Sequence, residues 1–162
     1  MGAITRAGMI RSLFTGLTLF TGLTFGLLAD KSTQAETGKQ HRVVIQVDQN
    51  DPALMSLALN NARNIIDSYR DKNQDVDIKV VAYGPGLHML REDTSPVKDR
   101  IKELSNVSFP GRIAFSACRN TMEGMEAREG HLISIIPQAG IVESGVVYIM
   151  ELQEQGYSYI KP

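Results

Sequence analysis

The chain has 162 residues, of which 43% are hydrophobic and 22% charged, with a single cysteine and no tryptophan. This composition is typical of one globular domain, and it excludes a disordered, collagen-like or disulfide-stapled chain. The 17 Lys and Arg residues are balanced by 18 Asp and Glu residues, so no basic excess exists that would bind a phosphate backbone. We therefore expect no nucleic-acid partner.

The first 35 residues have the pattern of a secretory signal peptide. Arg6 and Arg11 precede an uncharged apolar run at 13–29, and small residues offer cleavage sites near Ala35 or Ala29. The run has 17 residues, seven of them Gly or Thr, whereas a membrane-spanning helix needs roughly 20 apolar residues. A retained anchor is the alternative. A transit peptide is disfavoured because the run is apolar all round rather than amphipathic.

Cleavage after the first 35 of the 162 residues leaves a 127-residue mature chain. Its net charge changes from −1 to about −3, because three basic residues leave with one acidic residue. We expect this chain to be periplasmic or secreted, with no membrane span after cleavage. Residues 36–41 are predicted to form a flexible lead-in, and 42–162 to form the domain.

From residue 42 onward, short β-branched apolar runs alternate with longer amphipathic segments, which predicts βαβ units. Strands are expected at 43–47, 78–83, 112–117, a short segment ending near residue 142, and 157–160. Helices are expected at 52 to about 71, at 97–104, at 121 to about 128, and from 144 or 145 through 155. Asp51 and Ser144 (or Glu143) are the expected N-caps. The fold class is therefore α/β, as a single three-layer domain with a mostly parallel five-stranded sheet.

The first helix is predicted to bury a stripe of apolar residues at helical spacing: Leu54, Ala58, Ala62, Ile65 and Tyr69. Gly84-Pro85-Gly86 follows the second strand and is predicted to be a turn that lets the backbone come close to a ligand. It lacks the Lys and Ser/Thr of a phosphate-binding loop.

In a parallel sheet, ligands bind beyond the carboxyl ends of the strands, where helices present free N–H groups. Segments 48–51, 83–88, 118–121 and 143–145 are predicted to meet there. The candidate site residues in these segments are Tyr83, Gly84, Gly86, Cys118, Arg119, Asn120, Thr121, Ser144 and Gly145.

Cys118 is the candidate catalytic nucleophile. It lies between a strand and a helix start, so the helix dipole and the adjacent Arg119 both favour the thiolate. Asn120 and Thr121 begin the helix and are expected to stabilise the anion. The alternative is a buried cysteine that serves as a small hydrophobic residue.

Histidine and methionine side chains offer two weaker hypotheses. His88 or His131 could form a Cys-His pair with Cys118, although a histidine satisfied within a loop is the favoured interpretation. Met122 and Met125, with Cys118 and a histidine, could bind copper, but their spacing is more typical of a buried helix stripe. We expect no metal and no cofactor.

Residues 42–162 resemble the DsrE/DsrF-like family of small α/β proteins. The resemblance rests on the order and spacing of six segments: VVIQVD (43–48), LNNARN (59–64), VAYGPG (81–86), FSACRNT (115–121), VESGVV (142–147) and LQEQGYSYIKP (152–162). It implies a flavodoxin-like sheet, assembly as a homotrimer or homohexamer, and a cysteine after the third strand that matches Cys118. In the sulfur-oxidation and tRNA-thiolation branches, such a cysteine carries persulfide sulfur between partner proteins.

The resemblance implies a sulfur (persulfide) carrier or sulfurtransferase-like protein that acts through Cys118 with a sulfur-donor or acceptor protein. The sequence departs from the known relays, which are cytoplasmic hetero-oligomers, because this chain has the pattern of an exported protein. The alternative is a non-catalytic module that binds a small ligand or a partner and has a structural cysteine. A third hypothesis is redox sensing through a disulfide between subunits.

Overall fold

The computed structural model describes residues 41–107 and 112–162. The predicted signal peptide at 1–35 and the lead-in at 36–40 lie outside the described residues. Position 41 was predicted as part of the lead-in, and this is wrong: His41 begins the first strand, pairs with Val76, and stacks its ring on Tyr69 with centroids 3.9 Å apart. No helix in the described ranges is long and apolar enough to cross a bilayer.

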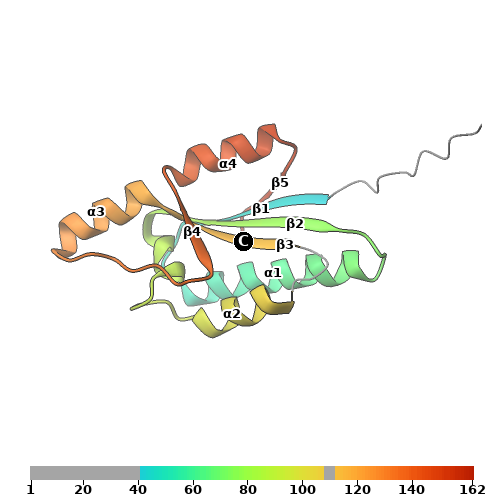
Figure 1. Cartoon of the computed structure of the whole chain (residues 1–162), viewed down its shortest axis with the longest axis horizontal. Coiled ribbons are helices and arrows are strands. Elements are labelled where there is room, and N and C mark those ends of the chain that lie inside the picture. The colour runs from blue at the N-terminus through green and yellow to red at the C-terminus, as the bar shows by residue number, and fades with distance from the viewer. Residues whose placement is uncertain (1–40, 108–111) are drawn as a thin grey trace, which may run out of the picture. The chain divides into compact units, whose positions relative to one another are not determined.

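The five strands form one sheet in the order β4-β3-β2-β1-β5, and every pair is parallel (Figure 1). The strands are β1 His41–Val47, β2 Val76–Ala82, β3 Arg112–Cys118, β4 Ala139–Val142 and β5 Ser158–Ile160. The central strands are apolar on both faces, as expected for a sheet covered on both sides. The predicted α/β class and five-stranded sheet are confirmed, and the sheet is entirely rather than mostly parallel.

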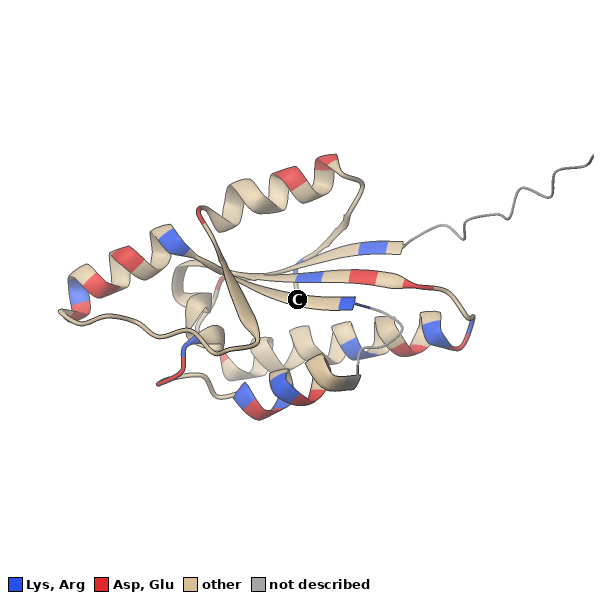
Figure 2. Cartoon of the chain, viewed as in Figure 1, with Lys and Arg blue, Asp and Glu red and all other residues tan. Residues whose placement is uncertain are grey.

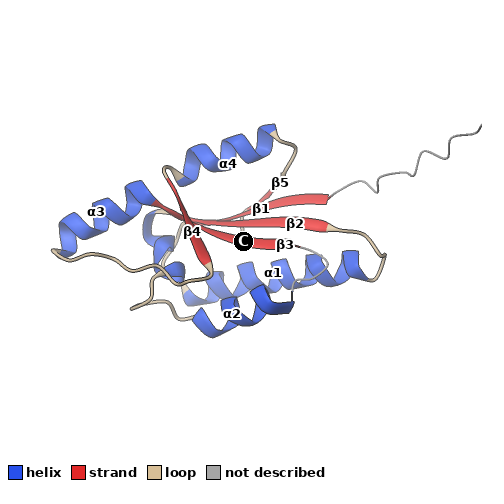
Figure 3. Ribbon diagram, in the orientation of Figure 1, coloured by secondary structure: helices blue, strands red, loops and turns tan. Residues whose placement is uncertain are grey.

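Helices cover both faces of the sheet (Figure 3). They are α1 Pro52–Arg70, α2 Lys98–Val107, α3 Arg119–Glu129 and α4 Gly145–Glu154, and a 3-10 helix, η1, spans Gly84–Leu90. Helices α1 and α2 share one face because β1, β2 and β3 follow one another in a single direction across the sheet. The chain then returns from β4 to β5 on the other side of β1, and a right-handed crossover places α4 on the opposite face.

The α1 helix starts as predicted but buries a slightly different stripe. Asp51 Oδ1 accepts hydrogen bonds from the N–H groups of Ala53 (2.8 Å) and Leu54 (3.4 Å), and Pro52 is the first helical residue. The fully buried positions include Met55, Leu59 and Ile66, whereas the predicted Leu54, Ile65 and Tyr69 lie only partly buried at the edge of the core. The helix is therefore rotated by about one residue from the predicted face.

The α4 helix packs on the sheet through a smaller cluster of apolar residues: Val44, Val81, Ile149, Leu152 and Tyr157. Its outer face carries Val146, Val147 and Met150, all about half exposed. Charged residues on this helix are confined to its C-terminal half (Figure 2). An uncharged apolar surface therefore lies over the first turns of α4.

The predicted Gly-Pro-Gly turn is instead the start of η1. Gly84 has φ +52°, which favours glycine, and Pro85 occupies a first-turn position of the 3-10 helix. A Cβ on Gly86 would lie 2.3 Å from the carbonyl oxygen of Val47, so only glycine fits against the end of β1. The segment is thereby fixed against the carboxyl edge of the sheet.

Candidate functional site

The carboxyl ends of the parallel strands bring the four predicted segments to one edge of the sheet. Strand β2 ends at Ala82, β3 at Cys118 and β4 at Val142, and Cys118 pairs with Val142 in the register. The segments that follow these strands provide Tyr83 and Gly84, Arg119 to Thr121, and Ser144 with Gly145. The candidate site therefore forms around the end of β3.

Helix α3 begins at Arg119, two residues earlier than the sequence predicted. Cys118 is consequently the N-cap residue, the position at which a side chain faces the first free N–H groups of the helix. A serine, threonine or aspartate normally occupies this position. Cys118 places a sulfur atom there instead.

The surroundings of Cys118 favour its thiolate. Its residue exposure is only 4%, and this burial raises the pKa of the thiol. A hydrogen bond from the Thr121 side chain and the backbone N–H groups of Gly145, Thr121 and Asn120 lower the pKa, and the net pKa is below its ordinary value. The thiol itself makes no cap hydrogen bond; its Sγ faces the Glu143 carbonyl oxygen at 3.9 Å. The N–H groups are therefore placed to stabilise the anion rather than the neutral thiol.

Thr121 connects the sulfur to η1. Its Oγ1 accepts a hydrogen bond from the Gly84 N–H at 3.0 Å, and its side chain lowers the pKa of the Cys118 thiol. A hydrogen bond thus joins the predicted members Gly84 and Thr121, and Thr121 lies in the first turn of the helix that Cys118 caps.

Gly145 approaches the sulfur from α4. A Cβ at this position would lie 3.0 Å from the Cβ of Tyr83 and 3.3 Å from the Cβ of Cys118. Such distances are tighter than ordinary contacts, so glycine lets the start of α4 come close enough for its N–H to reach the sulfur. Ser144 caps the same helix, and its Oγ accepts a 3.5 Å hydrogen bond from Val147 N–H. The role of Ser144 is thus to fix the helix start.

Arg119 lies beside Cys118 but has a carboxylate partner. Its Nε donates to Glu143 Oε1 at 2.9 Å, and both side chains are exposed. The Asn120 N–H donates to the Glu143 carbonyl at 3.2 Å. These contacts attach the start of α3 to the β4–α4 loop, and direct stabilisation of the thiolate by Arg119 stays a prediction.

A polar network at the end of β1 was not predicted from the sequence. Lys161 Nζ and Gln46 Nε2 both donate to Asp48 Oδ2, at 2.7 and 2.9 Å, and the Tyr159 hydroxyl donates to Gln46 Oε1 at 2.5 Å. Burial raises the pKa of the neighbouring Tyr83, and the Asp48 carboxylate raises it further. Tyr83 is therefore a neutral phenol that packs between this network and Gly145.

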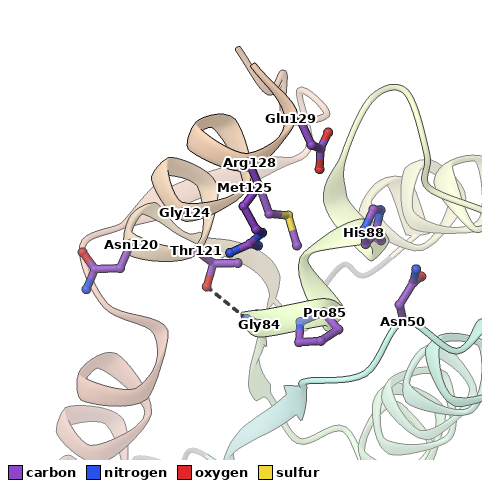
Figure 4. A pocket seen from close by; sticks show the side chains of 10 residues that line it. All are labelled: Asn50, Gly84, Pro85, His88, Asn120, Thr121, Gly124, Met125, Arg128 and Glu129. Carbon is purple, nitrogen blue, oxygen red and sulfur yellow. Dashed lines mark hydrogen bonds between the residues drawn. The ribbon is translucent and has the colours of Figure 1, made fainter. Parts of the chain in front are cut away.

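A pocket of about 520 Å³ opens between η1 and α3 (Figure 4). Its wall includes the predicted Gly84, Asn120 and Thr121, together with residues that the sequence did not single out. The latter are Asn50, Pro85, Gly124, Arg128 and Glu129. Gly86 does not line this pocket because it lies against β1. Ser144 borders a second pocket of about 510 Å³ between β4 and α4. Cys118 lies between the residues that line this pocket and those that line the first pocket.

An ion cluster around the buried Arg91 borders the first pocket, and the sequence did not predict it. Arg91 is 2% exposed and binds both carboxylate oxygens of Asp93 (2.9 and 2.6 Å) and of Glu129 (2.7 and 2.8 Å). The hydrogen bond to Glu129 and that to Asp93 raise the pKa of Arg91, and Arg91 in turn lowers the pKa of Asp93 to about 2. Nothing in the sequence distinguishes Arg91 from a surface arginine.

The histidines and methionines form neither a Cys-His pair with Cys118 nor a metal site in the described residues. His88 lines the pocket and shares its Nδ1 with Thr94 Oγ1 at 2.8 Å, whereas His131 lies 3.4 Å from Glu129. Met122 and Met125 are buried in the core, as the helix-stripe interpretation predicted. Within 41–107 and 112–162, no group of three His, Cys, Asp or Glu residues could hold a metal ion.

Comparison with known proteins agrees with this fold. One solved structure, a protein of unknown function from Methanobacterium thermoautotrophicum, is 30% identical, with a TM-score of 0.62. The match covers 75% of this chain and 99% of that one. No curated protein matches significantly. The model of the DsrE/DsrF-like family matches residues 42–162, the segment that contains the sheet, its helices and Cys118, and the chain belongs to that family.

Proposed function

We propose that the protein is a sulfur carrier in which Cys118 accepts sulfane sulfur as a persulfide and hands it on. The family is associated with sulfur relay. The observation that carries the proposal is the position of Cys118 at the N-cap of α3 and beside the first residue of α4. There the Thr121 side chain and the backbone N–H groups of Gly145, Thr121 and Asn120 lower the pKa of the thiol. Such a set stabilises a sulfur anion, which is the form that attacks sulfane sulfur.

The proposed cycle has two balanced steps. The Cys118 thiolate attacks the terminal sulfur of a donor persulfide, forms a new S–S bond, and releases the donor thiolate. An acceptor thiolate then attacks the outer sulfur of Cys118, which leaves with the electron pair of the breaking S–S bond. Neither step needs an oxidant or a reductant, because each one exchanges one S–S bond for another.

The position of Cys118 also fits delivery of the sulfur atom. A persulfide places its outer sulfur about 2 Å beyond Sγ, the length of an S–S bond. Cys118 lies between residues of two pockets, Thr121 on the α3 side and Ser144 on the α4 side. In the proposed cycle, the added sulfur atom has two neighbouring pockets through which a donor or an acceptor could approach it.

Mass spectrometry of the full chain after exposure to inorganic polysulfide tests this function. We expect added sulfur on the peptide that contains Cys118, and removal of that sulfur by a reductant. The Cys118→Ser variant is the control and should take up none. An unmodified Cys118 peptide in the parent protein would contradict the proposal.

The low exposure of Cys118 favours a second candidate, a binding module with a structural cysteine. The residue is only 4% exposed in the single chain, as expected for a small residue that fills space beside α4. In that case a Cys118→Ala variant would retain its ligand or partner. The polysulfide experiment distinguishes the two candidates.

We also propose a homotrimer or homohexamer and an exported location. The half-exposed Val146, Val147 and Met150 on α4 supply an apolar surface for contact between copies. Export follows from the signal pattern at 1–35, outside the described residues. Both proposals fit a carrier that meets its sulfur donor or acceptor protein outside the cytoplasm.

A further inference from the structure

Arg128 brings a guanidinium without a carboxylate partner among the described residues to the pocket between η1 and α3. In the parts of the chain that the structure describes, it has no hydrogen-bond or ion-pair partner. Its Nη1 lies 3.6 Å from the place that a Cβ of Gly124 would take, so the side chain folds back along α3 toward Thr121 (Figure 4). A guanidinium in this position offers several parallel N–H donors to an oxyanion.

The other groups on the wall do not pair with this guanidinium. Glu129 is the acidic residue of the lining, and both of its oxygens are held by Arg91 at 2.7 and 2.8 Å. His88 uses Nδ1 toward Thr94, which leaves Nε2 as a possible second donor to a ligand. Asn50 and Asn120 add neutral amides. The pocket is therefore suited to a small anion with several oxygen atoms.

The pocket and the sulfur share one residue. Thr121 lines the pocket and lies in the first turn of α3, the helix that Cys118 caps. A molecule bound by Arg128 would therefore lie along the same helix as the nucleophile. This arrangement separates two tasks: α3 binds an anionic group with its second half, and its first turn stabilises the attacking thiolate.

We propose that this pocket binds the oxyanion part of a small sulfane-sulfur donor, of which thiosulfate is the simplest. The inference rests on the proposed function of Cys118 and assigns its donor to small anions. The Cys118 thiolate attacks the outer sulfur of thiosulfate, and a new S–S bond forms. The old S–S bond breaks, and its electron pair leaves with sulfite. Three negative charges enter the step and three leave it, so no proton or oxidant is required.

Arg128 contributes through the leaving group. Sulfite gains electron density as the S–S bond breaks, and the guanidinium then binds it more strongly than it bound the thiosulfate oxygens. Because Arg128 is exposed, the same interaction should weaken as salt concentration rises. Arg112 is the matched control, since it is also exposed and unpaired in the described region but lies at the start of β3, at the other end of that strand.

Two measurements on the full chain test the inference. Sulfite titrated into the Cys118→Ser variant by calorimetry reports the pocket alone, and adding Arg128→Gln should weaken that binding about tenfold. In the parent background, Arg128→Gln should slow persulfide loading from thiosulfate about tenfold, and should slow loading from polysulfide less, because polysulfide has no oxyanion and releases no sulfite. Arg112→Gln should change neither reaction.

The outcomes separate this inference from the function on which it rests. If polysulfide loads Cys118 but Arg128→Gln behaves like Arg112→Gln toward thiosulfate and sulfite, the donor assignment is overturned and the carrier function stands. If neither donor loads the parent chain, both fall. Loss of thiosulfate loading in Arg128→Gln with recovery in Arg128→Lys supports the assignment.

Discussion

Thr121 Oγ1 accepts the Gly84 N–H at 3.0 Å, across the gap between η1 and α3. This bond holds the threonine side chain that lowers the pKa of the Cys118 thiol. Gly84 in η1 thereby positions a side chain that affects the pKa of Cys118 at the start of α3.

Removing the Thr121 hydroxyl should raise the pKa of Cys118. Thr121→Val keeps the shape of the side chain but removes a donor that favours the thiolate. Thr121→Ser keeps the hydroxyl and should leave the pKa near that of the parent. Thiolate absorbance at rising pH measures both variants. Equal titration curves for Thr121→Val and the parent would show that the hydroxyl has no electrostatic role.

Gly145→Ala should destabilise the fold. The new Cβ would press on Tyr83 and Cys118 at 3.0 and 3.3 Å, which costs about 1–3 kcal/mol in overpacked sites. Gly140→Ala is the control, because no atom lies within 4 Å of a Cβ built there. Urea unfolding of the two variants measures the difference. A Gly145→Ala midpoint equal to that of Gly140→Ala would contradict the close approach of α4.

Arg91→Met should change the response of stability to acid. Arg91 lowers the pKa of Asp93 to about 2, below its unfolded value, so the ionised carboxylate stabilises the fold above the unfolded pKa. That contribution is lost as the pH falls toward 2. The variant should therefore be less stable at neutral pH and lose less stability on acidification.

Urea midpoints at pH 7 and at pH 3 measure the Arg91 effect. Lys98→Met is the control, since its ion pair with Glu92 is exposed. A parallel pH profile for Arg91→Met and the parent protein would show that the Arg91 cluster contributes nothing to acid sensitivity.

Met150→Glu should weaken assembly through α4. The residue is 56% exposed on the uncharged part of the helix, so a charge there disfavours contact between copies without disturbing the core. Leu57→Glu, on an exposed position of α1, is the control. Light scattering coupled to gel filtration gives the molar mass. We expect an oligomer for the parent and for Leu57→Glu and a smaller species for Met150→Glu; an unchanged oligomer would place the interface elsewhere.

The periodic features of the sequence predicted the fold well. Strand and helix order, the caps Asp51 and Ser144, and the parallel sheet all follow from local patterns. The start of α3 was placed two residues late because cysteine is not a usual N-cap residue. The first residues of η1 were interpreted as a turn, since Gly-Pro-Gly is equally typical of both.

The site was predictable only in part. Cys118, Thr121 and Gly145 could be placed at one edge because parallel strands end together. The Arg91 cluster and the unpaired Arg128 depend on contacts between η1 and α3 that no local pattern encodes. The same is true of Gln46 and Lys161, which are 115 residues apart in the sequence and both bind Asp48.

The pKa of the Cys118 thiol in the full chain tests the central claim most directly. Thiolate absorbance, with the Cys118→Ser variant subtracted, gives the value for this single cysteine. A pKa below the reference of about 8.5 for free cysteine would agree with a thiolate held by Thr121 and the helix N–H groups. A pKa at or above that reference would contradict an activated sulfur carrier and leave Cys118 as a structural residue.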